Sequence, residues 1–192
     1  MPATPVFAEP PDRRCTSAKW GVQVCIRAAY SAFDTCQALR DVSRTHGLDA
    51  GFFTRLIWQE SRFDPNALSP AGAQVIAQFM PQTAKLRGLS ASYDPTITLD
   101  HSAEYLAELT HRFGNVGLAA VAYNGGETRA KNFISKNNGL AQETIDYVQI
   151  ISSQTAEDWR DTPPKTLNLA LDLVKTFMRS CLLLAKNAGF QN

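Results

Sequence analysis

The run Gly51-Phe52-Phe53-Thr54-Arg55-Leu56-Ile57-Trp58-Gln59-Glu60 decides how this chain is interpreted. Helical spacing places Phe53, Leu56 and Ile57 on one face, and Glu60 falls on that same face. A carboxylate on an apolar stripe loses hydration, and the negative end of the helix dipole also disfavours its charge, so its pKa should rise. A carboxylic acid that stays protonated near neutral pH can donate a proton to a leaving oxygen. Glu60 is therefore a candidate general acid, and the simpler alternative is a helix end that points into water.

The bulk composition is that of a globular protein. A length of 192 residues suits one domain with a sizeable core, and 44% hydrophobic with 19% charged residues excludes disorder. The formal net charge of +1 gives no reason to expect nucleic acid or an anionic membrane surface as a partner. The most apolar tail stretch, Leu167 to Ala185, is interrupted by Asp172, Lys175 and Arg179, so no transmembrane span is expected. The first residues, Met1 to Pro11, lack the apolar region of a signal peptide.

Four cysteines, Cys15, Cys25, Cys36 and Cys181, indicate two disulfides and an oxidising compartment, with four buried free thiols as the alternative. Cys25 and Cys36 could not bond within one straight helix, because eleven residues rise roughly 16 Å. The preferred pairing is Cys15–Cys25 with Cys36–Cys181. Neither the cysteines nor the three histidines have metal-ligand spacing, so neither a metal nor another cofactor is expected.

Hydrophobic periodicity predicts an all-α fold of many short helices with little or no β structure. The first helix should run from about Ser31 to Thr45, and the Glu60 helix should begin at an Asp49 cap and end at Asp64-Pro65. A short helix should begin at Pro81. The next should be capped by Asp100 and stop at Gly114, with an apolar face formed by Ala103, Leu106, Leu109 and Phe113. Three more are expected over 116–123, 127–134 and 141–152, and an amphipathic helix is expected in the tail beyond Leu167.

Four ordered motifs follow from Glu60. They are ESRF at 60–63, SPAGA at 69–73 running to QFMPQTA at 78–84, AYNGG at 122–126, and Glu143-Thr144 followed by Tyr147-Val148. This order resembles the soluble lytic transglycosylase family, whose members have a lysozyme-like catalytic domain that acts on the bacterial cell wall. The resemblance covers roughly 47–159 and implies a lysozyme-like, goose-type multi-helix domain at 31–160. An N-terminal arm at 1–30 and a linker with a C-terminal helix at 161–192 flank it.

Carried over to this sequence, the resemblance implies that Glu60 is the catalytic acid and base. It further implies that the sugar groove is lined by Ser69, Gln78, Met80, Tyr123, Asn124, Glu143 and Tyr147. From the residues alone, a plain loop cap is the favoured role of Ser69. One departure concerns Val75, which stands where the family uses glycine. A β-branched residue does not easily adopt a positive φ, so either the loop has adapted and the groove is normal, or Val75 narrows the groove. We expect the second outcome.

The resemblance implies cleavage of the MurNAc–GlcNAc bond of peptidoglycan with formation of a 1,6-anhydro-MurNAc end. Glycosidases usually need a second carboxylate, but neither Asp64, Asp94 nor Asp100 has a context that demands catalysis. The alternatives are a goose-type lysozyme-like hydrolase and a weakly active peptidoglycan-binding scaffold module. The expected location is the periplasm and the expected partner is the glycan strand, with a further partner in an envelope assembly left open.

Overall fold

A computed structural model of the chain describes residues 13–16, 19, 21, 23–27, 31–89, 94–163 and 174–187. The described part is helical apart from one short hairpin, in agreement with the predicted fold class. Its elements are β1 (Arg13–Cys15), β2 (Cys25–Arg27), α1 (Ser31–Thr45), α2 (Ala50–Ser61), α3 (Pro81–Leu86), α4 (Pro95–Phe113), α5 (Val116–Gly125), α6 (Glu127–Ile134), α7 (Gln142–Ser152), α8 (Ala156–Asp161) and α9 (Val174–Asn187).

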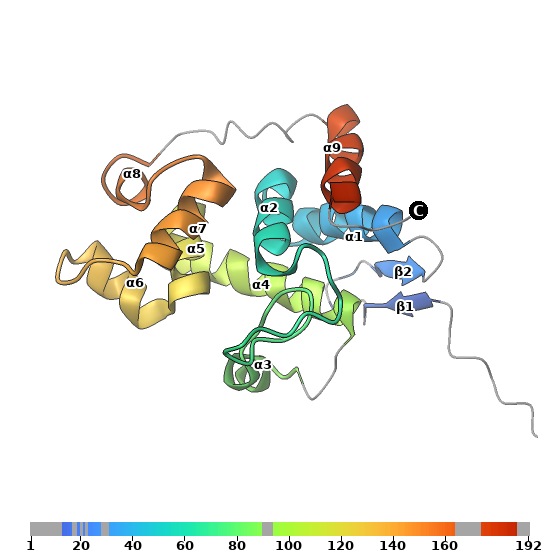
Figure 1. Ribbon diagram of the computed structural model, residues 1–192, viewed down its shortest axis with the longest axis horizontal. Coiled ribbons are helices and arrows are strands. Elements are labelled where there is room, and N and C mark those ends of the chain that lie inside the picture. Colours follow the sequence, from blue (N-terminus) through green and yellow to red (C-terminus); the bar gives the residue numbers. More distant parts are fainter. Residues whose placement is uncertain are drawn as a thin grey trace, which may run out of the picture.

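Helix α2 occupies the middle of the fold, between α1 and α7 (Figure 1). Its N-terminus is fixed by Asp49, whose carboxylate accepts a hydrogen bond of 2.7 Å from the backbone N–H of Phe52. Phe53, Leu56 and Ile57 are buried, as the apolar stripe predicts, and Phe52 beside them is buried too. The helix ends before the expected Asp64-Pro65 stop, because Arg62 adopts a left-handed conformation with φ 56°.

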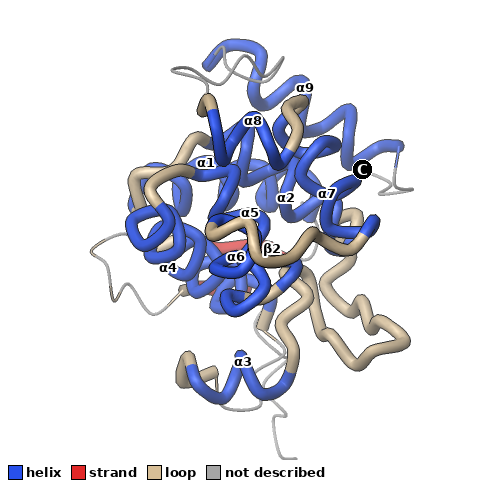
Figure 2. Tube along the Cα trace, turned by 90° about the vertical axis from the view of Figure 1, so that its left-hand side faces the viewer, coloured by secondary structure: helices blue, strands red, loops and turns tan. Residues whose placement is uncertain are grey.

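Helix α4 crosses the molecule below α2, and α5 packs against it (Figures 1 and 2). Asp94 caps α4 by accepting hydrogen bonds from the backbone N–H groups of Thr96 and Ile97. The prediction that Asp100 caps this helix is wrong. Asp100 lies within the helix, buried, and its Oδ1 is 2.8 Å from Nε2 of His46. Pairing with a histidine on the α1–α2 connection compensates the burial of this carboxylate.

Helix α8 was missed by sequence reasoning because it is only six residues long. A capping box formed by Thr155 and Asp158 begins it. Its Trp159 is buried, donates from the indole N–H to Ser152 Oγ at 2.9 Å, and lies directly over Gly117 of α5. A Cβ at Gly117 would come within 2.0 Å of the Trp159 ring, so this close packing of α5 and α8 requires glycine.

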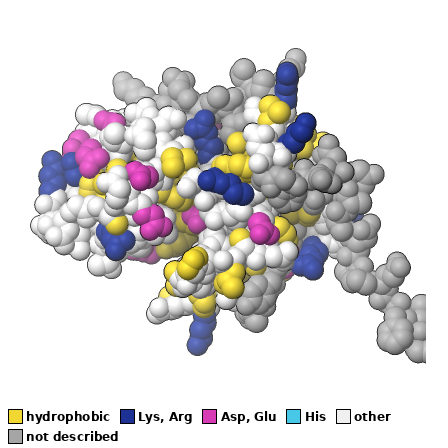
Figure 3. Space-filling view, in the orientation of Figure 1, with side chains coloured by type: hydrophobic (Ala, Val, Ile, Leu, Met, Phe, Trp, Pro, Cys, Tyr) yellow, Lys and Arg dark blue, Asp and Glu magenta, His cyan; other side chains and the backbone are white. Residues whose placement is uncertain are grey.

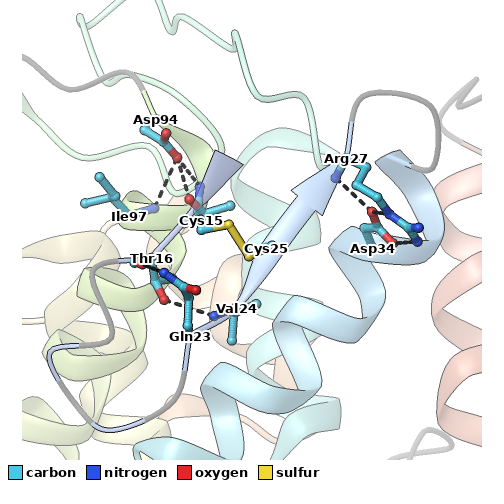
Figure 4. The surroundings of a disulfide bond; sticks show 10 residues. Cys15, Thr16, Gln23, Val24, Cys25, Arg27, Asp34, Asp94 and Ile97 are labelled. Carbon is cyan, nitrogen blue, oxygen red and sulfur yellow. Dashed lines mark hydrogen bonds and ion pairs between the residues drawn. A yellow bond between two sulfur atoms is a disulfide. The ribbon is translucent and has the colours of Figure 1, made fainter. Parts of the chain in front are cut away.

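The N-terminal arm contains the antiparallel pair β1–β2, which sequence periodicity did not predict since each strand has three residues. Cys15 and Cys25 are register partners and form a disulfide, which lies beside the N-terminal end of α4 (Figure 4). The Arg27 guanidinium hydrogen-bonds to Asp34 on α1 and holds the pKa of that carboxyl below its usual range. The arm is thereby attached to both α1 and α4.

The tail helix α9 is joined to α1 by the second disulfide, Cys36–Cys181, so both predicted pairings are confirmed. Phe177, Cys181 and Ala185 of α9 belong to the same hydrophobic core as α1, α2 and α4. The division into arm, catalytic domain and tail stays a prediction. The Pro-rich start at 1–12, much of the 90–95 loop, Pro164 and the tail residues 165–173 lie outside the described residues. Within the described part, no helix is long and apolar enough to span a membrane.

Candidate functional site

Glu60 lies in the last turn of α2, partly buried, on the wall of a cavity of about 760 Å³. Burial disfavours the charged carboxylate and is the main reason that its pKa is raised to about 7. The nearby Glu143 carboxylate raises the pKa in the same direction. A hydrogen bond from the Tyr147 hydroxyl to Glu60 Oε1, 2.5 Å long, acts against this by stabilising the ionised form. Desolvation prevails, so a substantial fraction of Glu60 carries a proton at neutral pH.

Tyr147 reaches Glu60 from α7, which is 87 residues further along the chain. The tyrosine is buried, and both its burial and the negative charge of Glu60 raise the pKa of its phenol well above the ordinary value. Its hydroxyl therefore stays protonated and donates to the carboxylate. This single contact fixes the orientation of Glu60 and keeps its pKa from rising further.

One wall of the cavity is the loop that follows α2 and leads into α3, and it carries Ser69, Gln78 and Met80. The Ser69 Oγ accepts a hydrogen bond of 3.0 Å from the backbone N–H of Ala73, so this serine does cap the loop. That bond uses the oxygen as an acceptor and leaves the hydroxyl hydrogen available to a ligand. The Gln78 carboxamide donates to the carbonyl oxygens of Ala67 and Val75, which ties the loop together.

Val75 adopts φ 57°, a left-handed conformation that favours glycine. The expectation that a β-branched residue would avoid this conformation is wrong. Its backbone N–H donates to the Ala67 carbonyl at 2.8 Å, and its carbonyl accepts from Gln78, so the loop holds it there. The Val75 side chain is buried and is not part of the cavity wall, so it does not narrow the groove.

Another part of the wall is formed by the end of α5 and the start of α7, which carry Tyr123, Asn124 and Glu143. The Tyr123 hydroxyl donates to the Ala77 carbonyl at 3.0 Å and lies 2.9 Å from Ser102 Oγ, linking α5 to the Ser69–Met80 loop and to α4. Asn124 accepts a hydrogen bond of 2.8 Å from Thr144 Oγ1, which joins the α5 turn to α7. Glu143 is exposed in the first turn of α7.

All eight residues singled out from the sequence thus line one cavity. Sequence reasoning missed several others, above all an aromatic cluster of Tyr105, Tyr123 and Phe79. Their ring centroids are 5.6 Å apart for Tyr105 and Tyr123, 6.2 Å for Phe79 and Tyr105, and 6.1 Å for Phe79 and Tyr123. The Arg87 guanidinium covers the Tyr105 ring at 4.6 Å. Tyr105 stands one position from the apolar stripe of α4, and this offset is the only sequence signal that could have indicated it.

The carboxylates of the cavity wall are Glu60, Glu143 and Asp146. The three aspartates weighed from the sequence do not contribute to this wall. Within the described residues, no group of three or more histidine, cysteine, aspartate or glutamate side chains is arranged to hold a metal ion. Chemically, the site presents a carboxylic acid of raised pKa in a groove bordered by aromatic rings and amide groups, an arrangement suited to general acid–base proton transfer.

Comparison with known proteins gives consistent matches. Residues 37–145 match the family model described as the transglycosylase SLT domain. A transglycosylase of Enterobacteria phage PRD1 is 36% identical over 88 residues, which is 46% of this chain and 33% of the phage protein. The soluble lytic murein transglycosylase of Salmonella typhimurium is 27% identical over 125 residues, 59% of this chain and 18% of that protein.

Among solved structures, an inactive mutant of the lytic transglycosylase Slt from Pseudomonas aeruginosa superimposes with a TM-score of 0.55 and 29% identity. The match covers 61% of this chain and 22% of the Pseudomonas chain. The chain thus spans no more than about a third of the length of these relatives. Since the family model covers more than half of the chain, from within α1 to α7, the chain belongs to the transglycosylase SLT domain family.

Proposed function

We propose that this chain is a peptidoglycan lytic transglycosylase that cleaves the β-1,4 bond between MurNAc and GlcNAc and leaves a 1,6-anhydro-MurNAc end. The observation that carries the proposal is Glu60, a carboxyl group with a pKa raised to about 7 on the wall of a cavity. Membership of the SLT family and the names of the relatives support the same substrate and reaction.

In the first step, protonated Glu60 gives its proton to the glycosidic oxygen as the bond to the muramic anomeric carbon breaks. The substrate's own N-acetyl group stabilises the positive charge at that carbon, so no protein nucleophile is needed. In the second step, ionised Glu60 takes the proton of the muramic C6 hydroxyl, whose oxygen closes the anhydro ring. A group that acts first as acid and then as base works best with a pKa near the working pH.

The other cavity residues take supporting roles in this proposal. Tyr147 holds Glu60 in one orientation and stabilises its carboxylate between the two steps. Ser69, with its hydroxyl hydrogen unused in the loop, would donate to the N-acetyl oxygen. Tyr105, Tyr123 and Met80 offer the apolar faces on which sugar rings pack. Glu143 raises the pKa of Glu60 and so favours the protonated starting state.

Two disulfides in the described residues support a location in an oxidising compartment, and we propose the periplasm. The acidic and basic side chains visible on one face are interspersed (Figure 3). This agrees with the net charge of +1 and gives no support for a nucleic-acid partner. The proposed partner is the glycan strand.

The decisive test is Glu60→Gln. Glutamine keeps the shape of the side chain and its ability to accept from Tyr147, but it cannot donate and recover a proton. The rate of peptidoglycan cleavage should fall by about two to four orders of magnitude while the fold survives. Glu157→Gln, the same change at an exposed position on α8, should behave as wild type.

Products are identified by mass spectrometry of the released muropeptides. Anhydro-muramic ends are expected, and reducing ends would assign the chain to lysozyme-like hydrolysis instead. A Glu60→Gln protein that cleaves at the wild-type rate would exclude the proposed mechanism. Binding of glycan without cleavage by the wild-type protein would favour the scaffold role.

A further inference from the structure

A second cavity, of about 830 Å³, adjoins the Glu60 cavity. The two share Gly125 and Gly126, the residues at the end of α5, so they lie on either side of this turn. The walls of the second cavity come from α6 and from the connection between α6 and α7. Most of its side chains are polar and include Thr128, Arg129 and Asn132.

The charges of the two cavities differ. Among the described residues, the wall of the Glu60 cavity has three carboxylates and no cationic side chain. In the second cavity, Glu127 is paired with Arg112, whereas Arg129 makes no ion pair or hydrogen bond with any residue that the structure describes. Arg129 is thus the only cation among the described residues that line either cavity, and its charge is available to a ligand.

The Arg129 side chain passes close to the junction of the two cavities. Its Cδ would lie 3.4 Å from a Cβ placed on Gly125, and Thr144 Oγ1 would lie 3.2 Å from the same point. Glycine at 125 therefore leaves room for the arginine to cross beside the shared wall. An arginine held at this position meets a ligand that extends out of the Glu60 cavity, and its planar guanidinium is suited to binding a carboxylate through two hydrogen bonds.

The substrate class named above has an anionic branch of this kind, and the following inference rests on that proposed function. Each muramic acid can carry a short peptide with free carboxylate groups on its lactyl oxygen. Such a branch is disfavoured along the wall of the Glu60 cavity that carries the Glu143 and Asp146 carboxylates, because like charges repel. We propose that the second cavity is a site for the peptide branch of the glycan strand and that Arg129 binds one of the peptide's carboxylates.

The test measures binding by calorimetry in the Glu60→Gln protein, which would hold the glycan without cleaving it. Two probes are compared, a GlcNAc–MurNAc tetrasaccharide with its peptides and the same tetrasaccharide with the peptides removed. We expect the peptide-bearing probe to bind more tightly. Adding Arg129→Gln should lower that preference by about three- to tenfold, since an exposed charge-assisted hydrogen bond is lost, and added salt should lower it too.

Two variants serve as controls, each in the Glu60→Gln protein. Lys131→Gln removes an exposed charge from the same helix at a residue that lines neither cavity, and it should keep the preference. Arg129→Lys should restore part of it. The inference would be overturned if Arg129→Gln left the preference for the peptide-bearing probe unchanged, or if Lys131→Gln lowered that preference equally. The proposed function would stand in either case, provided that both probes still bind. If Arg129→Gln lowered the affinity for both probes equally, the inference would also be overturned, and Arg129 would instead belong to a site for the sugar. If neither probe binds to the Glu60→Gln protein, the inference and the proposed function both fail.

Discussion

Replacing Tyr147 with phenylalanine tests how the structure sets the acidity of Glu60. The change removes one hydroxyl group, the donor of the 2.5 Å hydrogen bond to Glu60 Oε1. This bond stabilises the ionised carboxylate and lowers its pKa, against the upward effects of burial and of Glu143. Without the bond only the upward effects remain, so the pKa of Glu60 should rise further above its value of about 7.

The size of the change follows from the energy of the lost bond. A hydrogen bond to a charged group contributes about 1.5–3 kcal/mol, and about 1.4 kcal/mol corresponds to one pH unit in a titration. The proposed reaction needs protonated Glu60 at the start, so kcat/KM for the wild-type protein should fall as pH rises through about 7. In Tyr147→Phe, this fall should occur about one to two pH units higher.

The assay is kcat/KM on solubilised glycan strands from about pH 4 to about pH 10 at constant ionic strength. Tyr105→Phe is the matched control, because it removes a tyrosine hydroxyl from the same cavity without touching the bond to Glu60. The fall in its profile should stay at the wild-type pH. The maximal rate of Tyr147→Phe should be lower than that of the wild type, because Glu60 loses the contact that orients it.

The pH at which kcat/KM falls is the result that tests the prediction, whatever the maximal rate. A fall that stays near the wild-type pH, or moves to lower pH, would mean that the Tyr147 hydroxyl does not stabilise the Glu60 carboxylate in the working enzyme. The account of how Glu60 is kept near neutrality would then be wrong. Titration of the Glu60 carboxyl by carbon-13 NMR in both proteins checks the same shift without relying on catalysis.

Three further predictions concern stability and the loop. The folded-state pKa of Glu60, about 7, exceeds its ordinary value of 4.5, so the free energy of unfolding of the wild type should decline as pH rises between these values. Position 60 does not titrate in Glu60→Gln. Relative to the wild type, the free energy of unfolding of this variant, measured in urea, should therefore increase by about 1–3 kcal/mol between about pH 4 and pH 8. A difference in the free energy of unfolding between the two proteins that stays the same across this pH range would contradict this reasoning. Thiol titration of the denatured, unreduced protein should find almost no free cysteine, and opening the Cys36–Cys181 link should cost about 2–5 kcal/mol, measured by unfolding with and without reductant. Val75→Gly should leave glycan cleavage at the wild-type rate, since the valine is buried away from the cavity; faster cleavage would restore the idea that Val75 narrows the groove.

Much of the fold was predictable because its signals are local. The cap at Asp49, the proline at the first position of α3, the stop at Gly114 and the spacing of apolar residues set most helix positions to within one or two residues. The errors occurred where a local signal competed with a distant partner. Asp100 resembles a helix cap in sequence, but a buried histidine from the α1–α2 connection holds it inside α4. The β1–β2 pair depends on pairing across a ten-residue separation between Cys15 and Cys25, which strand periodicity in three residues does not indicate.

The candidate site was also predictable only in part. The motifs predicted which residues would meet, and the structure places all eight around one cavity. What they do to one another could not be predicted from the sequence. Helical spacing indicated that Glu60 lies on an apolar face, but its pKa depends on Tyr147 and Glu143, which α7 brings from more than eighty residues away. Burial alone would yield a poor base after the first proton transfer, and a well-solvated carboxylate would yield a poor acid before it. Desolvation and the neighbouring charge raise the pKa of Glu60, and one hydrogen bond from the Tyr147 phenol lowers it. The result is an intermediate acidity, which a residue needs if it is to donate a proton in the first proposed step and accept one in the second.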